Sequence, residues 1–176
     1  VILKVQENML TRSFLILLFT LASAANTFAQ KEKIQSVYVF NFISKYFEWP
    51  ATERSGDFVI GVLGNSLILD EFRELAKTRM VGNQKIVAAK FNSAADITKC
   101  HVLFIAKSKL DEIGAAVGKM GSTLVITDDE QGIKENVAIN FIIVDNKQKF
   151  EYKPAVAKSR GLTVSPELAK IAVNSN

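Results

Sequence analysis

The chain has 176 residues, of which 48% are hydrophobic, so it is long enough for one domain with a core of ordinary size. Its 22 Lys and Arg residues against 18 Asp and Glu residues give a formal net charge of +4, without basic tracts. A charge this weak and dispersed gives no support for a nucleic-acid partner, and none is expected. The single cysteine, Cys100, excludes an intramolecular disulfide.

Residues 1–29 have the pattern of an export signal. Arg12 precedes an apolar stretch at residues 14–25, and Thr27-Phe28-Ala29 offers a cleavage site. The stretch has 12 residues, fewer than the roughly 20 that a helix needs to cross a bilayer. We therefore expect a cleaved signal peptide with an upstream extension (residues 1–8), a periplasmic location, and one mature domain at residues 30–176.

Residues 31–49 show the periodicity of a helix that is rich in aromatic side chains. Its apolar arc is roughly 200° wide, whereas a surface helix has a stripe only a little wider than about 100°. Pro50 disfavours helix at the preceding residue and predicts an end at about Trp49. The excess width favours a partner or homodimer interface within residues 35–49, with burial in the domain core as an equal alternative. The predicted partner-binding residues are Tyr38, Phe40, Phe42, Tyr46, Phe47 and Trp49.

The segments that follow alternate between strand-like and helical patterns. Strands are predicted at residues 58–63, 85–91, 101–106 and 122–127, and helices at about 69–76 and 110–120. This alternation predicts an α/β fold, a three-layer αβα sandwich around a mostly parallel sheet. The last third predicts an antiparallel hairpin of residues 137–145 and 148–152 around Asn146-Lys147, a short helix at 154–159, and a closing helix from Ser165-Pro166 to about Val173.

Residues that could carry catalysis are sparse. Cys100 and His101 are the only cysteine and histidine, and neighbours on a strand point in opposite directions. A metal site or a catalytic thiol would need further groups converging on them. No serine lies in a G-x-S-x-G turn. The sequence therefore predicts no catalytic residue, no metal and no cofactor, and the Cys-His pair is interpreted as a buried thiol beside a strand-end imidazole.

Two loops keep a ligand-binding alternative open. Gly64, Asn65 and Ser66 join a predicted strand to a helix N-terminus, a geometry that can bind an anion, although the dinucleotide-binding spacing is absent. Asp128 follows another strand, at the edge where open α/β sheets bind ligands. Gly64, Asn65 and Asp128 are therefore the candidate ligand-binding residues. The plainer interpretations are that Gly64 and Asn65 only form a tight strand-to-helix turn and that Asp128 only begins a turn or helix.

Several motifs resemble a known family. Residues 37–45 (VYVFNFISK) with Glu48-Trp49-Pro50 resemble the opening motif of the YfiR/HmsC-like periplasmic proteins, and residues 99–108 (KCHVLFIAKS) resemble their central strand. The resemblance covers nearly all of residues 34–173. It implies a non-enzymatic periplasmic regulator that binds and restrains a membrane signalling enzyme, either a diguanylate cyclase that makes cyclic di-GMP or a sensor kinase. The best-known members carry disulfide pairs, so the lone Cys100 argues against redox control.

The leading hypothesis is therefore a binding module that uses residues 35–49 for a homodimer or for the periplasmic part of a membrane signalling protein. A small-ligand binding domain is the alternative. Replacing Phe40 or Phe47 by Glu is expected to disrupt association and leave the domain folded.

Overall fold

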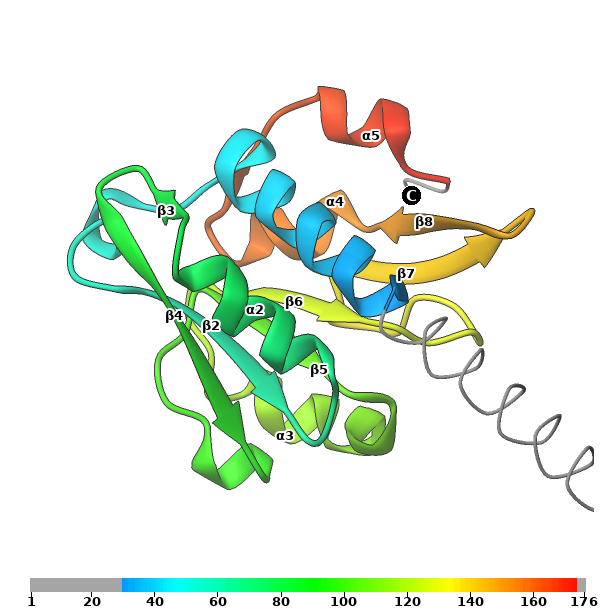
Figure 1. Ribbon diagram of the computed structural model, residues 1–176, viewed down its shortest axis with the longest axis horizontal. Coiled ribbons are helices and arrows are strands. Elements are labelled where there is room, and N and C mark those ends of the chain that lie inside the picture. Colours follow the sequence, from blue (N-terminus) through cyan, green and yellow to red (C-terminus); the bar gives the residue numbers. More distant parts are fainter. Residues whose placement is uncertain (1–29, 174–176) are drawn as a thin grey trace, which may run out of the picture.

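Short runs of apolar residues build the central sheet of the computed structural model, which describes residues 30–173 (Figure 1). Five strands run parallel, and an antiparallel strand closes each edge. The mostly parallel sheet and the late hairpin are therefore confirmed, whereas the predicted signal peptide lies outside the described residues. In spatial order the strands are β3 (Met80–Val81), β4 (Gln84–Phe91), β2 (Phe58–Leu63), β5 (Val102–Ile105), β6 (Leu124–Thr127), β7 (Ile139–Val144) and β8 (Lys147–Tyr152).

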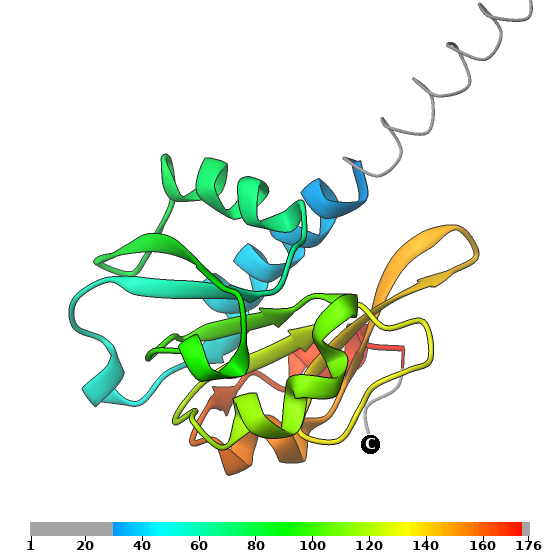
Figure 2. The same ribbon diagram turned by 90° about the horizontal axis from the view of Figure 1, so that it is seen from below.

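Helical segments cover both faces of this sheet, as the three-layer prediction requires (Figure 2). The first helix occupies residues 30–41 and is followed by a π-helical turn, η1 (Phe42–Tyr46). The other α-helices are α2 (Ile68–Ala76), α3 (Ile113–Val117), α4 (Pro154–Ser159) and α5 (Glu167–Ile171). Three 3-10 segments complete the set: η2 (Ala51–Glu53), η3 (Ala94–Asp96) and η4 (Lys107–Glu112).

The two faces of the sheet carry separate hydrophobic cores. The first helix and α2 cover the larger core, and α3 covers the smaller one. Strand β5 is buried throughout because Val102 and Phe104 face the larger core while Leu103 and Ile105 face the smaller. This explains why its sequence has no polar alternation.

The predicted helix of residues 31–49 is wrong beyond Tyr46. Phe47 and Glu48 form a short strand, β1 (Phe47–Glu48), which pairs antiparallel with β9 (Thr163–Val164). In an extended chain, side chains alternate, so Phe47 and Trp49 both enter the core while Glu48 faces solvent. The backbone N–H of Ser165 donates to Tyr46 O at 2.8 Å and fixes this junction.

Three other predicted boundaries need correction. The helix predicted at 110–120 is a 3-10 segment followed by the five-residue α3, and Gly114 and Gly118 lower helix propensity there. The hairpin turns at Asp145-Asn146 rather than at Asn146-Lys147, because both of these residues adopt positive φ angles, 51° and 58°. The closing helix ends at Ile171, two residues before the predicted end.

Candidate functional site

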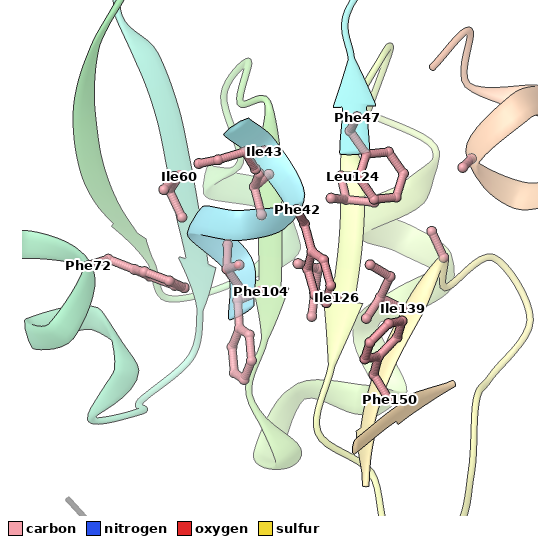
Figure 3. Packing of buried hydrophobic residues seen from close by; sticks show 14 of the residues in the cluster. Phe42, Ile43, Phe47, Ile60, Phe72, Phe104, Leu124, Ile126, Ile139 and Phe150 are labelled. Atoms are coloured by element: carbon pink, nitrogen blue, oxygen red, sulfur yellow. The ribbon is translucent and has the colours of Figure 1, made fainter. Parts of the chain in front are cut away.

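Three of the predicted partner-binding residues lie inside the domain. Phe42, Phe47 and Trp49 are only 1%, 4% and 4% exposed. Figure 3 shows Phe42 pointing into the packed side chains near Ile139 and Phe150, and its ring centroid lies 4.9 Å from that of Phe150. The Trp49 indole donates a hydrogen bond to Ser122 O at 2.8 Å. In the folded chain these three rings hold the first segment onto the sheet and offer no surface to a partner.

The other three predicted residues, Tyr38, Phe40 and Tyr46, lie at the margin of the core and are half-buried. The Tyr38 hydroxyl donates to Gln148 O at 3.3 Å, while its ring lies edge-on to Phe150 at 6.0 Å. The Arg79 guanidinium lies 5.4 Å from the Phe40 ring centroid, a cation–π contact. That Tyr38, Phe40 and Tyr46 bind a partner stays a prediction.

The outer side of the same helix carries apolar residues that the sequence prediction left out. Ile34 is 40% exposed and Val37 is 52% exposed. With Tyr38 and Asn41 they follow the i, i+3, i+4, i+7 spacing of one helix face and line a hollow of about 480 Å³. We call Ile34, Val37, Tyr38 and Asn41 the helix stripe. Their spacing was visible in the sequence, but the broad aromatic arc beside it hid this second face.

Ile143 of β7 adds to the apolar surface near the stripe. Its side chain is 53% exposed, and its cross-strand partner is Gln148. Directly opposed residues in an antiparallel pair project from the same face of the sheet. Gln148 meets the first helix, since the Gln35 side-chain amide donates to Gln148 Oε1 at 3.1 Å. Ile143 therefore projects from the face of the sheet that carries the helix.

A cleft opens at the carboxyl ends of the parallel strands. After β2 the chain crosses to β4 on one side, and it later returns to β5 on the other side, so β2 and β5 flank a topological switch point. The cleft there measures about 660 Å³. The structure brings all three candidate ligand-binding residues, Gly64, Asn65 and Asp128, to its wall. Its other polar lining residues are Lys31, Glu32, Ser66, Asp70, Arg73, Lys90, Lys107 and Glu130.

Ion pairs cross the mouth of this cleft. Lys31 Nζ lies 2.6 Å from Asp128 Oδ2, which ties the start of the first helix to the loop after β6. Lys107 and Glu130 lie 3.4 Å apart, and both are well exposed. Lys90, at the end of β4, forms no ion pair with a carboxylate of residues 30–173. Sequence reasoning missed these lysines, although Lys90 and Lys107 could have been found as charged residues at predicted strand ends.

The backbone conformation and close packing at position 64 explain why this residue is a glycine. Its φ angle is +90°, and a Cβ atom there would lie 2.7 Å from Lys109 Cγ and 3.2 Å from Ala106 Cβ. Both the left-handed backbone and the close approach require glycine. The interpretation as a tight strand-to-helix turn therefore explains this residue without a ligand.

Buried polar groups fix the loop that carries Asp128 and Glu130. Asn140 accepts hydrogen bonds from Thr127 Oγ1 at 2.7 Å and from the Asp129 N–H at 2.8 Å. Burial raises the pKa of Asp129, but the hydrogen bond from the Gln131 N–H and the nearby Lys134 ammonium outweigh burial and hold that pKa below its usual range. Because the buried Asp129 side chain fixes this loop, its neighbours Asp128 and Glu130 are held at the wall of the cleft.

The Cys100 and His101 pair has a structural role. Burial raises the pKa of the Cys100 thiol to about 12, so it stays protonated and unreactive at neutral pH. His101 is 5% exposed, and both of its ring nitrogens meet backbone groups, at Val59 and Glu53. Residues 30–173 contain no group of three or more His, Cys, Asp and Glu side chains arranged to hold a metal ion.

The fold and its surfaces define a doubly wound α/β domain with an exposed apolar helix face. The chain belongs to the YfiR/HmsC-like family, whose model matches residues 32–173. This is a family of periplasmic regulators rather than of catalysts. No curated protein is significantly similar to the chain. Within the part of the chain that the structure describes, no helix has the length and apolar character needed to span a membrane.

Proposed function

We propose that this protein is exported by a signal peptide at residues 1–29, binds the periplasmic part of a membrane signalling enzyme through the helix stripe, and restrains that enzyme. The observation that carries the proposal is the exposure of Ile34 and Val37 on a helix whose opposite face is fixed in the core. Regulators act through contacts with other proteins, and exposed apolar side chains in a row supply the central contacts of such interfaces.

The stripe has the properties of a preformed helical docking surface. Because Val39 and Phe42 anchor the other side of the segment, the helix loses little conformational entropy when a partner binds. Ile34 and Val37 supply apolar contact. Asn41 places one polar group in the row, which favours a single alignment of a partner helix along the stripe. A partner helix is the complementary element, because its side chains can interdigitate at the same spacing.

The same stripe is available to a second copy of the chain. A twofold axis through the stripe would bring Val37 of one copy near its equivalent in the other, so the interface would be self-complementary. Homodimer and partner complex would then compete for one surface. Release of the dimer would be a step in restraining the enzyme, which we propose to be a diguanylate cyclase or a sensor kinase.

The test is Val37→Glu, compared in cells that lack the chromosomal gene. Loss of the gene should raise cyclic di-GMP if the target is a cyclase, or activate the kinase reporter if it is a kinase. Wild-type protein should reverse the change, and Val37→Glu should fail to do so, because a charge at the centre of an apolar contact costs at least about tenfold in affinity. Purified Val37→Glu should also have a weaker dimer in analytical ultracentrifugation.

Lys149→Glu is the control, because Lys149 is exposed on β8, outside the first helix, and its side chain also becomes negative. It should behave as wild type in both measurements. Circular dichroism should show that both variants are folded, since neither position is in the core. Full complementation by Val37→Glu, or no change of either output on loss of the gene, would overturn the proposal.

A further inference from the structure

Two basic side chains lie near the N-terminus of α2 in the cleft: Lys90 is in β4, and Lys107 begins η4, two residues after the end of β5. Leu63, at the end of β2, is aligned with Phe91 of β4 and with Ile105 of β5. Lys90 and Lys107 therefore lie at the strand ends on either side of the turn that begins at Gly64, and both line the cleft. Lys90 has no carboxylate partner among residues 30–173, and Lys107 is held only by its exposed pair with Glu130 at 3.4 Å, so both ammonium groups can turn to an anion bound in the cleft.

The N-terminus of α2 is itself available to an anion. The nine-residue helix has Leu67 at its N-cap, which supplies no side-chain hydrogen bond. Ser66 Oγ accepts from the Ile68 N–H at 3.4 Å, and the N–H groups of Leu69 and Asp70 donate to Ser66 O and Leu67 O at 3.2 and 3.1 Å. The N–H groups of Ser66 and Leu67 have no hydrogen-bond acceptor among the described residues, so they are the donors left for an anion. The first N–H groups of a helix carry partial positive charge, and phosphate oxygens satisfy them well. Asp70 in the first turn is paired with Arg73 at 2.9 Å, so its charge is partly compensated.

The opposite wall of the cleft carries three carboxylates, two of which have a lysine partner: Asp128 is paired with Lys31, and Glu130 with Lys107. Asp128 and Glu130 come from the loop after β6, and Glu32 comes from the first helix. Glu32 Oε2 is buried and has no hydrogen-bond donor among the described residues. Carboxylates accept hydrogen bonds, so this wall suits the hydroxyl groups of a ligand rather than a second anionic group. The volume of about 660 Å³ is in the range of metabolite sites and far exceeds one phosphate ion.

From this polarity we infer that the cleft binds a sugar phosphate or a related polyol phosphate. The phosphate group lies over the N-terminus of α2 between Lys90 and Lys107, and the hydroxyl groups face Asp128 and Glu32. Leu69 and Phe104 line the apolar part of the cleft between the two ends. This inference goes beyond the proposed function and does not depend on it, because none of the residues of the helix stripe lines the cleft.

Isothermal titration of the purified full-length protein tests the inference, with glucose 6-phosphate and glycerol 3-phosphate as probes. Glucose lacks the phosphate, and gluconate carries a carboxylate in its place. We expect saturable one-site binding of at least one phosphate ester, weaker binding at higher salt, and none of glucose or gluconate. Lys90→Glu should weaken binding at least about tenfold, since a charge-assisted hydrogen bond is replaced by repulsion.

Lys85→Glu is the matched control, because Lys85 is exposed on the same strand but lies at its other end. It should bind as wild type does. Ser66→Asp is a second variant, in which a carboxylate caps α2 and preserves the fold while repelling the phosphate, so it too should lose binding. Absence of saturable binding to both phosphate esters, equal binding of glucose or gluconate, or equal losses in Lys85→Glu and Lys90→Glu would overturn the inference. Unchanged phosphate binding in Val37→Glu would show that the two surfaces are independent.

Discussion

His101 joins two backbone segments through both nitrogens of its ring. The Val59 N–H donates to Nδ1 at 3.0 Å, so the ring proton lies on Nε2 and is donated to Glu53 O at 2.9 Å. The ring also stacks on Phe58 at a centroid distance of 4.4 Å. The only histidine of the chain is therefore fully used in holding β2 to its neighbours, and it has no nitrogen left for a metal or a proton-transfer step.

Asp129 links the stability of the domain to pH. Its pKa is lowered in the folded state, so the carboxylate stabilises the fold at pH values above the ordinary Asp pKa of about 3.9. This contribution is lost as the pH falls through that ordinary value toward the folded one. We expect Asp129→Asn to reduce the free energy of unfolding by about 1–3 kcal/mol at pH 7. The difference from wild type should shrink by pH 3.

Urea unfolding at both pH values measures this difference. Asp70→Asn is the control, because Asp70 forms an exposed pair with Arg73 and should change stability little at either pH. A difference between wild type and Asp129→Asn that stays constant from pH 7 to pH 3 would contradict the electrostatic account.

The β7–β8 hairpin depends on two residues in the left-handed region. Asp145 and Asn146 have φ angles of 51° and 58°, as a two-residue turn with positive φ at both positions requires. Asn146→Gly should therefore keep or slightly raise the melting temperature. Asn146→Val should lower the free energy of unfolding by about 1–2 kcal/mol, because a β-branched residue is strained in this conformation. Equal stability of the two variants in thermal unfolding would show that the stability of the domain does not depend on the left-handed conformation at position 146.

Elements with one strong local signal could be predicted from the sequence, and those decided by a distant partner could not. The strand at residues 58–63 was predicted correctly because it is a compact apolar run between turn residues. Phe47 and Trp49 fit a wide helical arc and an alternating strand equally well. Pairing with Thr163 and Val164 selects the strand, and no local pattern reports that contact.

The candidate site was predicted in part for a similar reason. Gly64, Asn65 and Asp128 follow parallel strands, whose carboxyl ends share one edge of the sheet, so their convergence is a consequence of topology. Lys31 reaches the same cleft only because the first helix crosses the sheet at this place (Figure 1). That placement depends on tertiary packing, which the spacing of residues along the chain does not encode.

The whole domain unfolds as one unit if the first helix and the sheet share a core. Phe42 contacts Phe141 and Phe150 across the helix–sheet junction. We expect Phe42→Ala to lower the free energy of unfolding by about 3–5 kcal/mol while preserving a single transition. Val37→Ala, on the exposed side, should cost less than about 0.5 kcal/mol. Separate transitions for helix and sheet, followed by circular dichroism and Trp49 fluorescence, would contradict a shared core.

This shared core changes the interpretation of one proposed substitution. Phe47→Glu places a carboxylate in a position that is 4% exposed, so it should unfold the domain and cannot report on association. Phe40→Glu is less disruptive because Phe40 is half-buried, but it also removes the contact with Arg79. Exposed positions of the helix stripe separate binding from folding more cleanly.

The borders of the sheet limit how copies of this protein can meet. One border is β3, which has two residues and leads directly to Gly82 in a left-handed conformation. The other is β8, whose outward side chains include the exposed residues Lys147 and Lys149. Short or lysine-bearing borders disfavour edge-to-edge aggregation of strands into fibres. Main-chain hydrogen-bonding groups at these borders are therefore expected to contribute little to self-association, even where the protein is concentrated.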